Sequence, residues 1–313
     1  MVKKRILYWI AAVIVILLII PLFWSYRLCY ITLHPPRDKA TYESMGYSYP
    51  QITGWLDSIQ DKGALRDTMI INDKNEQLYA RWIAAPVPTN RTAVVLHGYQ
   101  GSSLSMLMIG YMFNHDLGFN VLLPDMRGHG KSQSRAVYMG WKERHEIVRW
   151  IEIANEIFGG DTQIAIHGIS MGGATTMIVA GDPNLPPTVR CAIEDCGYTS
   201  VEDAFSVSWN ENLKYLKFPL FNLGDIWCRI LYGWSFAEAS PLNSISNCNL
   251  PMLFIHGEKD SLLPVEMVHR LYEAKPGKKE LWILPDVDHG AAYLDHPEAY
   301  TERIRTFIES YFE

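Results

Sequence analysis

Cysteine and clustered positive charge are both scarce in this sequence, and each shortage excludes a class of protein. Only 5 of the 313 residues are cysteine, and their spacing fits neither a disulfide framework nor a zinc knuckle. They are therefore interpreted as structural thiols. The formal net charge is −6, and Lys and Arg cluster only at the N-terminus. Nucleic acid is therefore not an expected partner.

Apolar residues, in contrast, are plentiful. Hydrophobic residues make up 48% of the chain and charged residues 20%, a balance that supports a large core and excludes wholesale disorder. After roughly the first forty residues, about 270 remain, which is within the range of a single α/β domain. One domain with one core is expected.

The N-terminus carries an apolar run of a different kind. Residues 6–23 are mostly Ile, Leu and Val, interrupted by Pro21 and preceded by basic residues at 3–5. At about 1.5 Å per residue, a helix of this length just spans the roughly 30 Å hydrocarbon core of a bilayer. A cleaved signal peptide is the alternative, but no small-residue cleavage site follows. We expect residues 1–26 to be a single-pass signal anchor in the cell membrane.

The charges flanking this segment indicate its orientation. The basic residues at 3–5 favour a cytoplasmic N-terminus, whereas Arg27, Arg37 and Lys39 partly offset that bias. The denser cluster predicts that the globular part of the chain lies on the extracytoplasmic side.

The globular domain is expected to begin near residue 67. Residues 27–66 contain Pro, Gly and Tyr without clear periodicity and are interpreted as a linker and peripheral lead-in segment. Residues 68–71 and 78–83 are apolar runs separated by an Asn-Asp-Lys-Asn turn, which predicts a pair of antiparallel strands. The predicted domain covers residues 67–313.

Strands and helices alternate along most of this domain. Short continuous apolar strands between helices are typical of a mostly parallel sheet covered on both faces, so the predicted fold class is α/β. An aromatic-rich insertion at about 199–240 interrupts the alternation. Strands are expected at 93–96, 121–123, 164–166, 189–193, 252–255 and 281–284, with helices at 141–158, 171–180, 265–274 and 298–312.

The strongest local signal is a G-x-S-x-G pattern centred on Ser170. It directly follows the predicted strand at 164–166 and precedes a helix of small residues, which is the context of a nucleophile elbow. A serine on such a turn has a strained backbone, and glycines two residues away on either side avoid crowding. A Gly-rich turn with an N-cap serine is the simpler interpretation, but the context favours Ser170 as a nucleophile.

A serine nucleophile needs a base, and the base needs a carboxylate that orients it. Asp260 and His289 each follow a predicted strand, at the sheet edge where ligands bind in open α/β folds. The order Ser170, Asp260, His289 is also one that known hydrolases use. These three residues form the predicted catalytic set.

Other carboxylates compete with Asp260 for the role of the acid. Asp195 follows the predicted strand at 189–193, and Glu258 is a near neighbour that can assist by hydrogen bonding. Asp286 and Asp288 are too close to His289 in the sequence to be the first choice.

Acyl transfer also needs hydrogen-bond donors for the oxyanion. The sequence His-Gly-Tyr-Gln-Gly at 97–101 follows the predicted strand at 93–96. The backbone N–H groups of Tyr99 and Met171 are therefore the expected donors. A plain strand-ending turn at 97–101 is the alternative.

Two apparent motifs fail. The Gly-Lys-Ser at 130–132 resembles the end of a phosphate-binding loop, but Asp125 stands where that pattern requires Gly. The His-Glu pair at 145–146 lacks the second His of a zinc-binding helix, because Arg149 stands there. Neither a cofactor nor a metal is expected.

With the serine elbow, the His-Gly at 97–98, the ordered acid and base and the Asp-Met-Arg-Gly-His-Gly-Lys-Ser stretch at 125–132, the chain from about 67 to 313 resembles the α/β-hydrolase superfamily. It is most similar to bacterial serine aminopeptidase-like, cinnamoyl-esterase-like and acylglycerol-lipase-like members. The resemblance implies structural roles for Asp125, Arg127 and His129.

The resemblance also places the insertion at 199–240 over the active site as a helical cap. Its aromatic side chains either line an apolar acyl or aromatic pocket or simply pack against the core. They are Phe205, Trp209, Tyr215, Phe218, Phe221, Trp227, Tyr232, Trp234 and Phe236.

The expected activity is hydrolysis of a carboxylic ester, with a small-molecule ester or acyl substrate and an acyl-enzyme on Ser170. A peptidase, a thioesterase or an acyltransferase would use the same residues and differ only in what enters the cap. A non-catalytic, membrane-tethered binding protein is an alternative of another class. The complete set of site residues argues against it.

Overall fold

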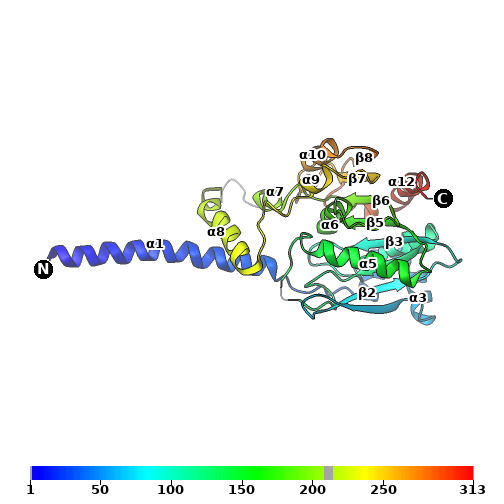
Figure 1. Ribbon diagram of the computed structural model, residues 1–313, viewed down its shortest axis with the longest axis horizontal. Coiled ribbons are helices and arrows are strands. Elements are labelled where there is room, and N and C mark those ends of the chain that lie inside the picture. Colours follow the sequence, from blue (N-terminus) through cyan, green and yellow to red (C-terminus); the bar gives the residue numbers. More distant parts are fainter. Residues whose placement is uncertain (1, 135, 208–213, 313) are drawn as a thin grey trace.

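The structure is a computed structural model that describes residues 2–134, 136–207 and 214–312. A layered α/β body lies at one end of the molecule, and one long helix projects from it (Figure 1). The expected α/β class, with a mostly parallel sheet between helices, is confirmed.

The central sheet has 8 strands in the order β1-β2-β4-β3-β5-β6-β7-β8. The β1–β2 and β2–β4 pairs are antiparallel, and all the other neighbouring pairs are parallel. The strand β4, which follows β3 in the chain, lies on one side of β3, and β5 lies on the other side. The order of the strands in the sheet therefore reverses at β3. The strands are β1 Arg66–Ile71, β2 Gln77–Ile83, β3 Arg91–Leu96, β4 Asn120–Pro124, β5 Gln163–Ile169, β6 Val189–Asp195, β7 Met252–Gly257 and β8 Lys279–Leu284.

Helices cover both faces because the buried strands are apolar on both sides. In β3, Ala93 and Val95 belong to the core cluster that contains α3 and α12, whereas Val94 and Leu96 belong to the cluster that contains α5 and α6. The helices of the body are α3 Thr53–Asp61, α4 Leu107–Tyr111, α5 Glu143–Ile157, α6 Met171–Ala180, α9 Pro241–Ile245, α10 Glu266–Ala274, α11 Ala292–Asp295 and α12 Pro297–Glu309.

Each predicted strand lies inside an observed one, and the predicted helices differ from the observed ones only at their ends. The segment 27–66 differs more from its interpretation as a linker. It contains α2 (Tyr42–Ser48) and α3, and Leu56 and Ile59 of α3 are buried in the core. Helices of 7 and 9 residues complete only about two turns each, too few for a 3.6-residue period to show in the sequence.

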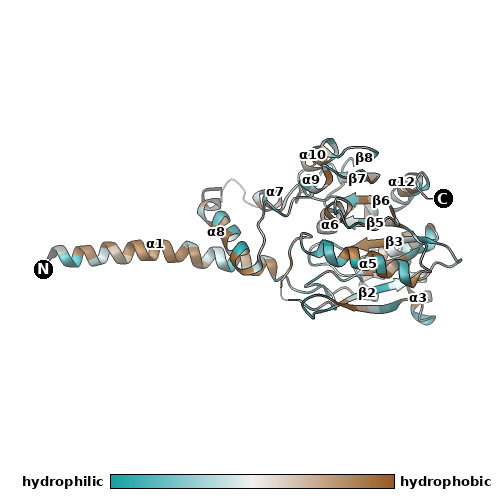
Figure 2. Cartoon of the chain, in the orientation of Figure 1, coloured by the Kyte–Doolittle hydropathy of each residue, from teal (hydrophilic) through white to brown (hydrophobic). Residues whose placement is uncertain are grey.

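The projecting helix is α1, Val2–Leu33, with 32 residues. It passes through Pro21 and continues beyond residue 26, where the anchor was expected to end. It is long and apolar enough to cross a membrane, and its most apolar stretch is not buried against the rest of the protein. It is hydrophobic along most of its length (Figure 2). Only its C-terminal part packs on the body, where Cys29 and Leu33 are buried.

The insertion between β6 and β7 forms α7 (Val201–Val207) and α8 (Lys214–Tyr232). Figure 1 shows α8 beside the C-terminal part of α1, away from the sheet. The indole N–H of Trp227 on α8 donates to Ser25 Oγ at 3.1 Å, and its ring meets that of Tyr26 edge-on at 5.7 Å. Trp209 and the side chain of Tyr215 lie outside the described part of the chain.

Candidate active site

Ser170 lies on a sharp turn between β5 and α6, with φ 58° and ψ −119°. Its N–H donates to Asp195 O at 2.8 Å, which fixes the turn against β6. A Cβ on Gly168 would lie 2.1 Å from Gly172 O, and one on Gly172 would lie 2.2 Å from Leu96 O. Side chains have no room at these two positions, so the glycines of the G-x-S-x-G pattern are required by close backbone approach.

The structure brings Ser170, His289 and Asp260 together. Ser170 Oγ lies 2.8 Å from His289 Nε2, and His289 Nδ1 lies 2.7 Å from Asp260 Oδ2. An ionised carboxylate only accepts hydrogen bonds, so Nδ1 carries the proton and Nε2 is left to accept from the serine hydroxyl. This arrangement allows the imidazole to take a proton from Ser170.

Asp260 is held in its charged form. Burial alone would raise its pKa, but hydrogen bonds from His256 and His289 and from the Leu263 N–H hold it well below its usual range. Its Oδ1 accepts from the N–H groups of Leu262 and Leu263 at 2.9 and 2.7 Å. The carboxylate is therefore both ionised and fixed in position beside the imidazole.

The competing carboxylates bind elsewhere. Asp195 accepts from the hydroxyl of Tyr300 at 2.9 Å, and burial raises its pKa to about 6. Asp288 accepts from Ser261 and from the backbone N–H of His289, and Asp286 pairs with Lys259. Among the described residues, Asp260 is the only carboxylate hydrogen-bonded to the ring of His289.

The loop after β3 lies against the nucleophile. Gly101 N–H donates to Gly98 O at 3.0 Å, which closes a turn in which Gln100 has a positive φ of 63°. A Cβ on Gly98 would lie 3.3 Å from Ser170 Cβ. Within the described chain, the N–H groups of Tyr99 and Met171 donate to no other protein group. Both donors are thus available to a bound oxygen near Ser170.

Two buried histidines fix this loop. His97 Nδ1–H donates to Gly98 O at 2.8 Å while its Nε2 accepts from Met126 N–H at 2.9 Å. His129 Nδ1–H donates to Arg127 O at 2.9 Å while its Nε2 accepts from Gln100 N–H at 3.1 Å. Burial, followed by repulsion from His97, lowers the pKa of His129 to about 3. Both rings are therefore neutral and can donate and accept at once.

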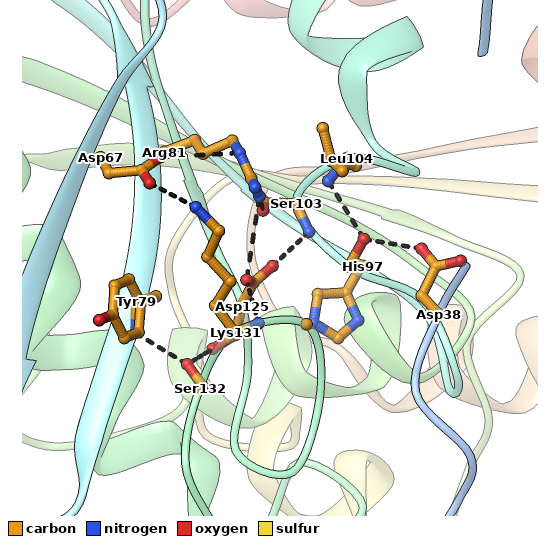
Figure 3. Close-up of polar contacts among 12 residues, drawn as sticks. Asp38, Asp67, Tyr79, Arg81, His97, Ser103, Leu104, Asp125, Lys131 and Ser132 are labelled. Carbon is orange, nitrogen blue, oxygen red and sulfur yellow. Dashed lines mark hydrogen bonds and ion pairs between the residues drawn. The ribbon is translucent and has the colours of Figure 1, made fainter. Parts of the chain in front are cut away.

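Asp125 joins the same loop to β2 and to the 125–132 stretch (Figure 3). Its carboxylate accepts from the N–H groups of Ser103 at 2.6 Å and Lys131 at 2.7 Å, and Arg81 lies nearby at 3.9 Å. Ser132 Oγ donates to Asp125 O at 2.5 Å and accepts from Tyr79 N–H at 2.8 Å. These contacts support the expected structural roles of Asp125 and His129.

Two neighbours of the site were not identified from the sequence. His256 lies at the end of β7, and its Nε2 lies 3.3 Å from Asp260 Oδ2. Cys196 follows β6 with a φ of 47°, and its Sγ lies 4.0 Å from His289 Nε2. Their positions at strand ends, beside the predicted acid and base, were the available signal. Burial raises the pKa of the Cys196 thiol far above its usual value, which keeps the thiol neutral.

An apolar cavity of about 440 Å³ lies between the C-terminal part of α1, the cap and Tyr99. Phe205, Phe221 and Phe236 of the insertion line it. Among the rings that the structure describes, the others in the insertion do not. Trp234 is buried in the core, Phe218 is exposed, Trp227 packs against Tyr26 of α1, and Tyr232 packs against His34, which follows α1. Both outcomes expected for the aromatic side chains are therefore found within one insertion.

Comparison with known proteins agrees with this architecture. Residues 93–233 match the sequence model of a family described as "alpha/beta hydrolase fold". The protein YqkD of Bacillus subtilis is 29% identical over 226 residues, covering 72% of this chain and 73% of YqkD. The yeast membrane protein YNL320W of Saccharomyces cerevisiae is 20% identical over 254 residues, covering 81% and 83%.

Among solved structures, the Pyrococcus furiosus esterase PF2001 has the same fold. It superposes with a TM-score of 0.68 at 21% sequence identity, and the match covers 91% of this chain and 100% of the esterase.

Proposed function

We propose that this chain, which has the α/β-hydrolase fold, is a serine hydrolase that cleaves carboxylic esters through an acyl-enzyme on Ser170. The pair of hydrogen bonds that runs from Ser170 Oγ through His289 to Asp260 carries this proposal. The esterase PF2001, with the same fold, supports it as the reaction class.

The reaction follows from the positions of the protons. Ser170 Oγ attacks the ester carbonyl as its proton moves to His289 Nε2, and Asp260 stabilises the imidazolium that forms. His289 then returns the proton to the leaving alcohol as the C–O bond breaks, leaving an acyl group on Ser170. A water molecule, deprotonated by the same nitrogen, attacks the acyl-enzyme. The bond between the acyl carbon and Ser170 Oγ then breaks, His289 returns the proton to Ser170 Oγ, and the acid leaves.

The developing oxyanion is bound by the N–H groups of Tyr99 and Met171. The Met171 N–H is at the N-terminus of α6, where the helix dipole also favours negative charge. Each such donor is worth about 10²–10³ in rate in other enzymes. The turn at Ser170 supports this arrangement, because Ser170 Oγ lies 2.8 Å from His289 Nε2 and Met171 is the next residue in the chain.

The proposed enzyme is anchored in the cell membrane by α1. The length and composition of this helix and the relative named as a membrane protein support the anchor. The basic residues at 3–5 support a cytoplasmic N-terminus and an extracytoplasmic hydrolase domain at 67–313, capped by 199–240. Protease digestion of intact spheroplasts tests the orientation. Cleavage of the domain before lysis agrees with it, and protection until lysis contradicts it.

The test of the reaction uses the full chain in detergent micelles, because Cys29 and Leu33 of α1 pack on the body. We expect labelling by a fluorophosphonate probe and turnover of p-nitrophenyl acetate. Both should disappear in Ser170→Ala. A folded chain that neither labels nor hydrolyses any ester would contradict the proposal.

A further inference from the structure

We propose that the natural substrate is a long-chain fatty acyl ester taken from the bilayer, and that its acyl chain occupies the cavity between α1, α8 and Tyr99. This inference rests on the proposed serine hydrolase function and adds the substrate class. It makes the anchor helix one wall of the substrate site rather than only a tether.

The walls of the cavity come from two helices that are far apart in the sequence. Leu28, Cys29 and Leu33 of α1 form one side, and Leu220 and Gly224 of α8 form part of the other. The volume of about 440 Å³ is within the range of ligand pockets. A lining that is mostly hydrocarbon, with few polar groups to satisfy, suits a fatty acyl chain better than a polar ligand.

Tyr99 joins this cavity to the candidate catalytic centre. Its side chain lines the cavity, and its hydroxyl donates to Thr32 O of α1 at 2.7 Å. Its backbone N–H is a proposed oxyanion donor, and the preceding Gly98 lies against Ser170. An acyl carbonyl held at Ser170 therefore has its chain directed past Tyr99 to the space between α1 and α8.

The same end of α1 is at the membrane surface. The apolar run at 6–23 covers about 27 Å as a helix, close to the thickness of the hydrocarbon core. The cavity-lining residues of α1, from Ser25 to Leu33, come directly after this run in the same helix. The cavity is thus placed at the level of the lipid head groups, where ester bonds of membrane lipids are found.

The exposed apolar side chains of α8 fit this placement. Phe218, Ile226, Ile230 and Leu231 are large apolar side chains with exposed fractions of 74%, 47%, 67% and 48%. The helix α8 packs on the C-terminal part of α1, next to the projecting part of that helix (Figure 1). Exposed apolar side chains on a helix next to a membrane anchor are typical of a helix that lies in the membrane interface. Lipid, rather than water, then covers the cap next to the cavity.

The decisive experiment narrows the cavity from both walls in the full chain, reconstituted in phosphatidylcholine nanodiscs. In Gly224→Trp and Leu28→Trp the indole is directed into the cavity. A Cβ on Gly224 meets nothing closer than the ring of Phe236 at 3.9 Å, so the backbone of α8 tolerates it. Asn222→Trp, on the exposed side of the same helix, is the matched control.

Two p-nitrophenyl esters report on the cavity. We expect each cavity variant to lower kcat/KM for the laurate ester by more than about tenfold, because the indole fills space that several methylene groups would occupy and each is worth about tenfold or more. The acetate ester should stay within about twofold, because it does not reach past Tyr99. Asn222→Trp should change neither rate.

A third readout tests whether the acyl chain comes from a bilayer lipid. Wild-type protein should release lauric acid from monolauroylglycerol and dilauroylphosphatidylglycerol placed in the nanodiscs, and Ser170→Ala should not. Release from neither lipid, with laurate ester still hydrolysed, overturns the bilayer as the source.

The outcomes separate this inference from the function on which it rests. Unchanged laurate rates in both cavity variants, with acetate hydrolysis still dependent on Ser170, overturn the inference alone. No Ser170-dependent hydrolysis of either ester overturns the proposed function. If Gly224→Trp loses acetate hydrolysis through misfolding, Leu28→Trp on the opposite wall decides the question.

Discussion

The two sides of the candidate site are built in different ways. Ser170, His289 and Asp260 stand on the ends of parallel strands, within a body whose backbone and side chains are densely hydrogen-bonded. On the cap side, α8 meets the C-terminal part of α1 through contacts such as the edge-on packing of Trp227 on Tyr26 and the single hydrogen bond from Trp227 to Ser25. The first side fixes reacting atoms, and the second gives an apolar boundary that can vary without moving them.

The largest effect that this comparison predicts is that of Asp260→Asn. The amide of Asn would donate to His289 Nδ1, which moves the proton to Nε2 and prevents that nitrogen from accepting from Ser170. We expect kcat for p-nitrophenyl acetate to fall by about 10⁴-fold, as for other triads. Asp286→Asn is the control, because Asp286 pairs with Lys259 at the surface. A loss of less than about tenfold would contradict the assignment of Asp260 as the acid.

Two tryptophans compare the stability of the two sides. Trp150 on α5 has an exposed fraction of 1%, and Trp150→Ala should lower the free energy of unfolding by about 3–5 kcal/mol. Trp227→Ala loses a half-buried ring and one hydrogen bond, so about 1–2 kcal/mol is expected. Thermal melts measure both. Acetate hydrolysis should survive in Trp227→Ala, and its loss would show that the cap also fixes the reacting atoms.

His129→Ala tests whether the loop after β3 is positioned by a side chain that touches no substrate. Losing the acceptor for Gln100 N–H should loosen the turn at Tyr99 and lower kcat by about 10–100-fold with little change in KM. His129→Gln, which keeps an acceptor, should recover part of the rate. His145→Ala is the exposed control. A rise in KM for His129→Ala as large as the expected fall in kcat would indicate a role in substrate binding instead.

The smallest predicted effect concerns Glu194, buried behind the site. Its Oε2 accepts from Gly197 N–H at 3.0 Å, and burial raises its pKa to about 8. A carboxyl whose folded pKa is raised makes the protein less stable as pH rises from its unfolded value of about 4.3 toward about 8. Glu194→Gln should therefore match the wild type at pH 5 and melt a few degrees higher at pH 8. If the melting temperatures of Glu194→Gln and the wild type changed by the same amount between pH 5 and pH 8, this prediction would be contradicted.

The sequence predicted the sheet well because the information is local. In β5 and β6, continuous apolar residues next to Gly-rich turns specify a buried strand whatever the neighbouring strands are. The elbow at Ser170 was predicted for a similar reason. Its glycines are required by close backbone contacts, which lie within a few residues or with the adjacent β3. The positions of Asp260 and His289 followed from the rule that parallel strands end at one edge.

Other features were not readable from the sequence. The helices α2 and α3 are too short to show a period, and His256 and Cys196 approach the site only because β6 and β7 are neighbours. The sequence favoured Asp260 over Asp195 and Asp288 by its position, but the hydrogen-bond partners that distinguish these carboxylates come only from the coordinates.

The sequence by itself determined an α/β fold, an apolar N-terminal helix of membrane-spanning length and a serine on a strand–turn–helix elbow. Each of these depends on periodicity or on sterics between residues close in the chain. The tertiary structure alone decided that α1 continues to Leu33, that α8 packs against it and that three of the cap's rings line a cavity beside Tyr99. Those features depend on contacts between segments about two hundred residues apart, and no local pattern specifies such contacts.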